Sequence, residues 1–208
     1  MPHRQGISYW LLSIVALASI LVGNIMALSQ QSVKRLLAYS GIVQAGFILI
    51  GFLQFRLENS WIILYYLIAY TSASLVMFLG SYFVEEKSGT DDHSAFKGLY
   101  YNNPFLAIVL SIALISLGGG PLTAGFMAKL FVLNNAAQAG NIVLVIFALI
   151  LAVLSLVYYF RIINLMFTKT DEERKWQINF TYRSILSLLS IGTIIAGIIP
   201  YLLVNLIK

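Results

Sequence analysis

The sequence predicts an all-α membrane protein with about six transmembrane helices, the fourth of them discontinuous. Of its 208 residues, 60% are hydrophobic and only 10% are charged, whereas soluble domains carry about 25% charged residues. The apolar residues gather in runs of about 20 or more, the helix length that crosses a bilayer core of about 30 Å. These runs lack the alternation of β-strands, and backbone groups in lipid must be satisfied within helices or closed barrels. The runs are therefore predicted to be helices.

Polar connections separate the apolar runs, and none is long or varied enough to form a second domain. Residues 1–208 are therefore expected to form a single transmembrane helical domain. The first run is longer than the apolar region of a signal peptide and is interpreted as a retained span. The candidate spans are residues 9–28, 33–54, 61–84, 104–137, 141–167 and 184–207.

The run at 104–137 is too long for one straight helix to cross the bilayer and too short for two crossings. Inside it lies the sequence GGGP, in which Gly118, Gly119 and Gly120 lack a Cβ atom and Pro121 lacks an N–H group. The helical hydrogen-bond ladder is therefore expected to break there. Two arrangements follow: a single discontinuous span, or a re-entrant hairpin that returns to its own side.

The distribution of basic residues favours the single crossing. With one crossing, the basic connections at 30–35, 85–103 and 168–183 share one side of the membrane. Membrane proteins concentrate Lys and Arg on the cytoplasmic side, whereas a hairpin would place the third of these connections outside. Both chain ends are accordingly expected on the non-cytoplasmic side.

Lys129 lies just beyond the predicted break, within an apolar sequence. Backbone groups freed by the break must face protein or water rather than lipid, and an ammonium group at the bilayer centre costs at least about 2.5–3.5 kcal/mol. Because burial disfavours the charged form, this amine is a candidate proton relay. The alternative is a side chain that snorkels to an interface near Asn134 and Asn135. The helix break favours the relay, since a snorkelling lysine does not require one.

Further polar residues are candidates for lining a hydrated path to Lys129. They are Gln44, Thr123, Ser155 and Tyr158. Such residues more often serve as contacts between membrane helices, so this alternative stays open. Near the start of the second span, Lys34 is either a topological charge facing anionic lipid head groups or a site of proton uptake.

The chain has no cysteine and only two histidines, which excludes disulfides and iron–sulfur clusters within it and leaves too few ligands for a haem or di-metal site. The sequence EEKSGTDDH at 85–93 matches no known ligand spacing and is expected to be a solvated connection. The formal net charge of +5 is explained by membrane topology rather than by binding to nucleic acid. No metal or cofactor site is therefore predicted, and the expected surroundings are membrane lipid.

Three segments of the chain resemble, in order, the antiporter-like subunits of respiratory complex I. They are NIMALSQQSVKRLLAYSGIVQAGFILIG at 24–51, SLGGGPLTAGFMAKLFV at 116–132 and YYFRIINLMF at 158–167. The last two favour subunit N over subunits M and L. The resemblance implies that residues 9–167 form the second of two five-helix antiporter-like repeats, and that residues 184–207 form the final helix.

In this resemblance, Lys129 falls on the broken-helix lysine that is implicated in proton transfer, and Lys34 falls on the lysine of the K-R-x-L-A-Y-S motif. Gln44 stands where many relatives have histidine, so an imidazole proton carrier is absent from that position. The first repeat is missing, which implies that another chain or segment supplies the N-terminal half.

The resemblance implies a translocase subunit of an NADH:quinone oxidoreductase in the cell inner (plasma) membrane. Such a subunit moves protons without redox chemistry of its own. NADH, FMN, iron–sulfur clusters and quinone are therefore expected elsewhere in the complex, and the other membrane subunits of complex I are the expected partners. Two alternatives stay open: a subunit of a multi-subunit cation/proton antiporter, which shares this fold, and a structural membrane subunit without its own ion path.

Overall fold

The computed structural model describes residues 6–53, 56–170 and 175–207. In these ranges the chain is an all-α bundle, and its extended pairing is confined to one isolated bridge between Ser32 and Asp92. Gln54, the last residue of the expected second span, and both chain termini lie outside the described residues. The elements are α1 (Ile7–Leu28), α2 (Val33–Leu53), η1 (Leu57–Asn59), α3 (Ser60–Ser88), η2 (His93–Phe96), α4 (Leu99–Asn102), α5 (Pro104–Gly118), α6 (Ala124–Gln138), α7 (Ile142–Phe167), α8 (Phe180–Ile198) and α9 (Pro200–Ile207).

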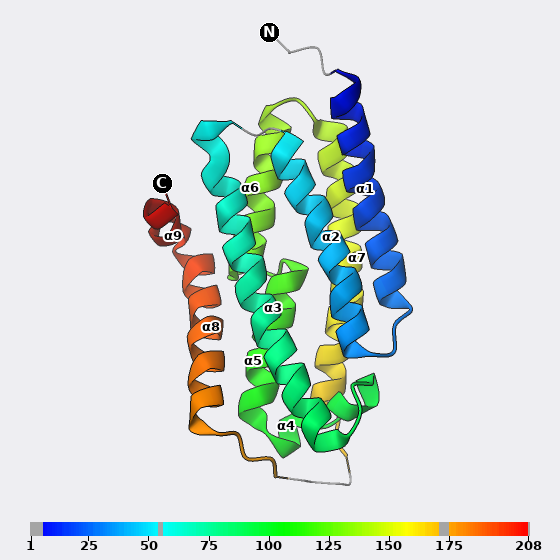
Figure 1. Ribbon diagram of the computed structural model, residues 1–208, viewed down its shortest axis with the longest axis vertical. Helices are drawn as coiled ribbons and strands as arrows, with labels where there is room; N and C mark the ends of the chain where they lie inside the picture. Colours follow the sequence, from blue (N-terminus) through cyan, green and yellow to red (C-terminus); the bar gives the residue numbers. More distant parts are fainter. Residues whose placement is uncertain (1–5, 54–55, 171–174, 208) are drawn as a thin grey trace.

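The long helices cross the bundle in alternating directions (Figure 1). Among the described residues, five helices are long and apolar enough to span a membrane: α1, α2, α3 with its preceding turn, α7 and α8. A sixth crossing is made by α5 and α6 together, which follow one another from one end of the bundle to the other (Figure 1). The single discontinuous span is therefore confirmed, and the re-entrant alternative is wrong.

The connections between α1 and α2, between α3 and α5, and between α7 and α8 lie at the same end of the bundle, as a single crossing requires (Figure 1). We call this end the basic end, because most of the described Lys and Arg side chains in the connections and adjoining helix ends belong to it. They are Lys34, Arg35, Lys87, Lys97, Lys169, Lys175 and Arg183, against Arg56 at the opposite end.

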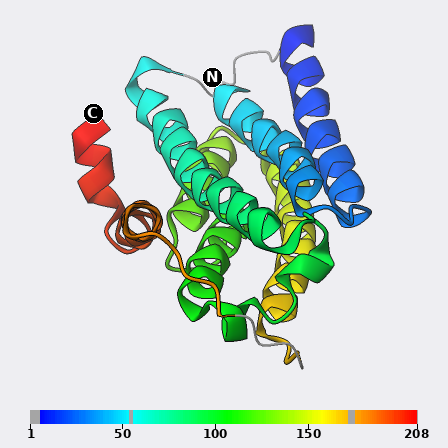
Figure 2. The ribbon, with the colours of Figure 1, turned by 60° about the horizontal axis from the view of Figure 1, so that its bottom comes forward.

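The expected final span at 184–207 is wrong in its extent and in its continuity. α8 begins at Phe180 and ends at Ile198, and α9 starts anew at Pro200. Proline lacks the N–H of the helical ladder and disfavours the helical conformation in the residue before it. Ile199 accordingly leaves the helical region, with φ −123° and ψ 66°, and α9 turns away from the axis of α8 (Figure 2).

The connection at 85–103, of which 85–93 is expected to be solvated, packs on the basic end: residues 85–92 are exposed or partly exposed, and residues 93–99 bury apolar side chains. α3 continues to Ser88, and the rest forms η2 and α4. Val33 donates its backbone N–H to the carbonyl of Asp91 at 2.9 Å, and His93 donates to the carbonyl of Gln31 at 2.9 Å. Phe96 and Leu99 are fully buried. The burial of these apolar side chains beneath the acidic sequence is the reason why the connection packs.

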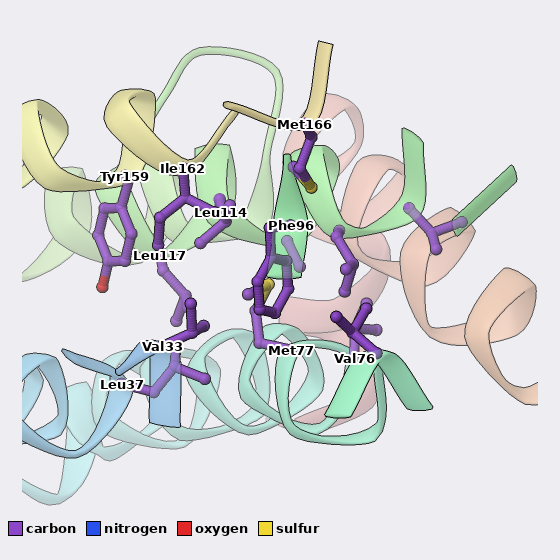
Figure 3. Packing of buried hydrophobic residues seen from close by; sticks show 14 of the residues in the cluster. Val33, Leu37, Val76, Met77, Phe96, Leu114, Leu117, Tyr159, Ile162 and Met166 are labelled. Carbon is purple, nitrogen blue, oxygen red and sulfur yellow. The ribbon is translucent and has the colours of Figure 1, made fainter. Parts of the chain in front are cut away.

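The buried apolar side chains form two clusters that meet around Tyr70, which packs against both. One cluster fills the half of the bundle toward the basic end, where Val33, Met77, Phe96 and Met166 approach one another from four elements (Figure 3). The other fills the opposite half and includes Phe47 and Val132. Residues of α5 belong to the first cluster and residues of α6 to the second. The break between α5 and α6 therefore lies between the two clusters.

Candidate functional site

The site is built on the end of α5, where the chain leaves the helix inside the bundle. The last four carbonyls of an α-helix have no partner within it. Gly119 adopts a left-handed conformation with φ +83°, and this turn lets its N–H bond the Ser116 carbonyl at 2.9 Å while Gly120 N–H bonds the Ile115 carbonyl at 2.8 Å. The carbonyls of Leu117 and Gly118 remain for groups outside the turn. Gly118 was expected to belong to the break but is the last residue of α5.

Lys129 satisfies these two carbonyls. Its Nζ atom donates to the oxygen of Leu117 and to that of Gly118, each at 3.0 Å, and the residue is only 6% exposed. The side chain therefore points back to the break, and the expected alternative of snorkelling to the interface near Asn134 is wrong. The stem passes so close to Gly119 that a Cβ atom there would lie 2.9 Å from Cδ of Lys129.

The amine lies in negative potential although no carboxylate among the described residues pairs with it. The carboxyl end of a helix bears about half a negative charge from its aligned peptide dipoles, and both carbonyls that hold Lys129 belong to this end of α5. The ring centroid of Phe47 lies 5.0 Å from Nζ, within the range of a cation–π contact. The ion pair in the described part of the chain is elsewhere, between Lys34 and Glu85.

Gln44 joins α2 to the same carbonyl. Its Nε2 atom donates to the oxygen of Leu117 at 2.9 Å, and its Oε1 atom accepts from the hydroxyl of Tyr66 at 2.5 Å. The backbone oxygen of Leu117 thus accepts hydrogen bonds from Gln44 of α2 and from Lys129 of α6. Tyr66 of α3 joins this group through its bond to Gln44. The structure brings Gln44 to Lys129 as expected, and its role in a proton path stays a prediction.

Thr123 holds the second half of the break rather than contacting Lys129. As the N-cap of α6 it accepts from the N–H of Phe126 at 3.4 Å, and its hydroxyl donates to the carbonyl of Gly120 at 2.7 Å. Pro121 and Leu122 lie between Gly120 and Thr123 and complete the turn. The backbone of Leu122 is left-handed, with φ +65°. The break therefore extends from Gly119 to Thr123, two residues beyond the expected GGGP sequence.

Ser155 and Tyr158 belong to a separate polar group between α1 and α7. The hydroxyl of Tyr158 donates to Oδ1 of Asn24 at 3.2 Å, and Nδ2 of Asn24 donates to the carbonyl of Leu151 at 2.9 Å. Ser155 bonds the carbonyl of Ala152 within its own helix at 2.6 Å. These bonds tie helices together, and none of them reaches Lys129. A path-lining role for Ser155 and Tyr158 stays a prediction.

Lys34 lies at the basic end and pairs with Glu85 at the end of α3, with both side chains partly exposed. Its Nζ atom also lies 5.9 Å from the ring centroid of Tyr82. The positive charge at the start of α2 is therefore balanced by a carboxylate of the neighbouring helix. A role in proton uptake stays a prediction.

A groove of about 340 Å³ opens between α6 and α7 and reaches Lys129. Its lining includes the backbone of Gly118 and Gly119, the polar side chains of Lys129 and Asn134, and apolar side chains of the two helices. In the described part of the chain, no three His, Cys, Asp or Glu side chains gather where they could hold a metal ion.

Comparison with known proteins places this architecture in a family. The family described as "NADH:quinone oxidoreductase/Mrp antiporter, TM" matches residues 1–155. The chain belongs to this family. It is 40% identical over 195 residues to the NADH-quinone oxidoreductase subunit N of Flavobacterium johnsoniae, a match that covers 93% of this chain and 42% of that protein.

Two solved structures share the fold. A chain of respiratory complex I from Thermus thermophilus superposes with a TM-score of 0.83 at 29% identity, covering 94% of this chain and 45% of that one. A chain of the membrane-bound sulfane sulfur reductase, an archaeal respiratory membrane complex, superposes with a TM-score of 0.87 at 29% identity, covering 96% and 41%. The resemblance to an antiporter-like subunit N is confirmed, and the chain spans less than half the length of these relatives.

Three residues that the sequence did not single out form hydrogen bonds or an ion pair at or near the candidate site. Tyr66 bonds Gln44, Asn24 links α1 to α7, and Glu85 neutralises Lys34. Asn24 alone offered a local signal, as an amide within a long apolar run. The other two become meaningful only through partners on neighbouring helices.

Proposed function

We propose that this chain is a proton-translocating membrane subunit, or part of one, of an NADH:quinone oxidoreductase. In this proposal the chain performs no redox chemistry. Electron transfer between NADH and quinone, with FMN and iron–sulfur clusters, takes place in other subunits and shifts the charge felt by the membrane arm. The chain converts that shift into uptake and release of a proton at Lys129, and is in that sense a translocase subunit.

The observation that carries the proposal is the pair of carbonyls that hold Lys129. A neutral amine has two N–H donors and one lone pair, whereas an ammonium has three donors. Two acceptors at 3.0 Å match the two donors of the neutral form, and the ammonium can keep both bonds, which its charge strengthens, while its third donor needs another acceptor. The amine can therefore gain or lose its third proton while both bonds stay in place, so protonation requires no rearrangement of the break.

The test is proton pumping by the assembled complex in sealed vesicles, driven by NADH and quinone. Lys129→Ala should abolish or strongly lower pumping, and so should Lys129→Arg, because a guanidinium keeps its proton at all accessible pH values. Assembly of the complex is measured in parallel by the yield of the purified enzyme. Unchanged pumping in the two variants would refute a relay at this position.

The remaining features of the proposal follow from the family and from the arrangement of charge. We place the basic end on the cytoplasmic side of the plasma membrane, with both termini on the other side. Residues 9–167 serve as one antiporter-like repeat and 184–207 as a following segment, and another chain or segment supplies the counterpart repeat. The partners are the other membrane subunits of the complex and membrane lipid.

The family description favours a second candidate, since it also covers Mrp antiporters. In that case the chain would exchange protons for another cation without any electron transfer. Sodium-dependent formation of a pH gradient in vesicles without NADH oxidation would support this candidate. Wild-type transport by Lys129→Met would instead favour a structural subunit without its own ion path.

A further inference from the structure

Helix α8 ends against the break between α5 and α6. It starts at the basic end and stops at the level of the break, where Pro200 prevents its continuation (Figure 1). Gly197, in its last turn, is buried, and a Cβ atom there would lie 2.4 Å from the carbonyl carbon of Thr123 and 2.5 Å from the carbonyl oxygen of Leu122. These are backbone atoms, so no side-chain rotation can make room for a larger residue. The backbones of α8 and of the break are therefore in direct contact.

Leu122 has a backbone conformation that its own side chain does not explain. Its φ of +65° lies in the left-handed region, which bulky L-residues rarely adopt. The side chain is 68% exposed, so burial does not hold it in place. Such a conformation persists only where the surrounding structure imposes it. The neighbour that lies against the carbonyl of Leu122 is Gly197 of α8.

A hydrogen bond fixes the same end of α8 to the bundle. Tyr65 of α3 donates its hydroxyl to the carbonyl of Ala196 at 2.5 Å, which satisfies one of the backbone oxygens that a helix leaves free at its carboxyl end. The ring of Tyr65 is fully buried and packs edge-on against Phe131 of α6, with 5.2 Å between the ring centroids. Tyr65 thus contacts α8 next to Gly197 and α6 two residues after Lys129.

The two helix ends that meet at the break carry opposite partial charges. The carboxyl end of α8 is negative, and the amino end of α6, where Thr123 is the N-cap, is positive. Their approach is therefore favourable. Lys129 lies in the second turn of α6, so the position of this helix end determines where its amine meets the carbonyls of Leu117 and Gly118.

We propose that the carboxyl end of α8 holds the break in its observed conformation, and that Gly197 and Tyr65 are positioning residues for Lys129. Gly197 supports Leu122 by backbone contact, and Tyr65 fixes the end of α8 that makes this contact. Helix α8 thereby takes part in proton translocation through the backbone of the break. The inference rests on the proposed function.

The backbone contact is tested by Gly197→Ala in the assembled complex. Ordinary contact starts at 3.4 Å, so a methyl group now 2.4 Å from Thr123 should displace the break from α8 by about 1 Å, the difference between these distances. A misplacement of this size can cost about a hundredfold in rate, and proton pumping per assembled complex should fall by about tenfold to a hundredfold. Gly192→Ala, in the same helix with open space around the new methyl group, is the matched control and should pump at the wild-type rate. Wild-type pumping by Gly197→Ala, in an enzyme that Lys129→Ala inactivates, overturns this inference alone.

A merely structural role for the end of α8 is separated by rescue. Tyr65→Phe keeps the buried ring and removes the bond to Ala196, and pumping per assembled complex should fall by about two- to tenfold, the factor that one hydrogen bond represents. Adding Leu122→Gly should restore pumping, because glycine adopts a positive φ without support from α8. Wild-type pumping by Tyr65→Phe, or a loss that Leu122→Gly leaves in place, would assign Tyr65 to packing and overturn the inference. Tyr65→Phe adds no bulk, so it decides the matter even where Gly197→Ala lowers assembly.

The geometry is also tested independently of transport. A cryo-EM map of the Gly197→Ala complex should show Leu122 moved away from α8 and Nζ of Lys129 beyond hydrogen-bonding distance of at least one of its two carbonyl oxygens. Both bonds unchanged at 3.0 Å in that map would overturn the inference. This result would leave the proposed function untouched, since the Lys129 variants test it separately.

Discussion

Gly125 is the point at which the two halves of the broken helix press most closely together. It lies in the first turn of α6, facing the end of α5, and its N–H donates to Oγ of Ser116 at 3.2 Å. A Cβ atom at this position would lie 1.9 Å from the carbonyl oxygen of Ser116, where 3.4 Å is the start of ordinary contact. The variant Gly125→Ala would therefore push α6 away from α5 by about 1.5 Å, the difference between these two distances.

The size of the effect follows from three contributions. Overpacking a well-filled core costs about 1–3 kcal/mol, and loss of the bond to Ser116 adds about 1 kcal/mol. Alanine regains up to about 1 kcal/mol over glycine through its helix propensity. The net expectation for Gly125→Ala is a destabilisation of about 1–3 kcal/mol. Gly192→Ala, in α8 with open space around the new methyl group, should instead gain up to about 1 kcal/mol.

Thermal unfolding of the detergent-solubilised protein compares the two variants. Their free energies of unfolding should differ by about 1–4 kcal/mol, which corresponds to a separation in Tm of roughly 2–16 °C for a chain of this size. Because the carbonyls of Leu117 and Gly118 move with α5, Gly125→Ala should also lower proton pumping. Equal melting temperatures for Gly125→Ala and Gly192→Ala would refute the tight contact between α5 and α6.

Two further predictions concern the basic end. Lys34→Met should cost at most about 1 kcal/mol, since its pair with Glu85 is partly exposed; lower proton pumping at an unchanged Tm would support proton uptake at Lys34, and wild-type pumping would argue against it. Burial, together with the charge of Arg161, lowers the pKa of His93 against the opposing effect of Asp92. Because the unfolded chain then binds the proton more readily, docking of residues 89–98 should be fully stable above about pH 6.5 and weaken as the pH falls below it. Hydrogen exchange in this segment, corrected for intrinsic rates, should rise between about pH 6.5 and 5 in the wild type but not in His93→Leu; identical profiles would contradict this account.

The broken helix could be predicted from the sequence because its signals are local. A run too long for one crossing contains three glycines and a proline, and each of these residues changes the backbone at its own position. Pro200 is a signal of the same kind in the final span, where it separates α8 from α9 within a mostly apolar sequence. The ends of these helices can thus be predicted from the glycine and proline residues of the sequence, provided that every proline is considered.

The contacts around the break could not be predicted in this way. That the carbonyl of Leu117 accepts from both Gln44 and Lys129 depends on how α2 and α6 meet α5. The docking of 89–98 has the same origin, since the acidic residues suggest water while Phe96 and Leu99 find their burial only against other helices. Hydropathy along the chain predicts which residues avoid water. It does not predict which of these residues contact one another in the fold.

The direction of Lys129, however, follows from helix geometry alone. In an α-helix the Cα–Cβ bonds tilt toward the amino end, so a long side chain covers the turn that precedes it. Lys129 lies in the second turn of α6, and the preceding turn adjoins the break. Its amine is thereby directed to the free carbonyls of α5, and reaching the interface beyond the carboxyl end of α6 would require the opposite direction. A lysine one or two turns after a break in a membrane helix is therefore coupled to that break by the backbone itself, whatever the neighbouring helices contribute.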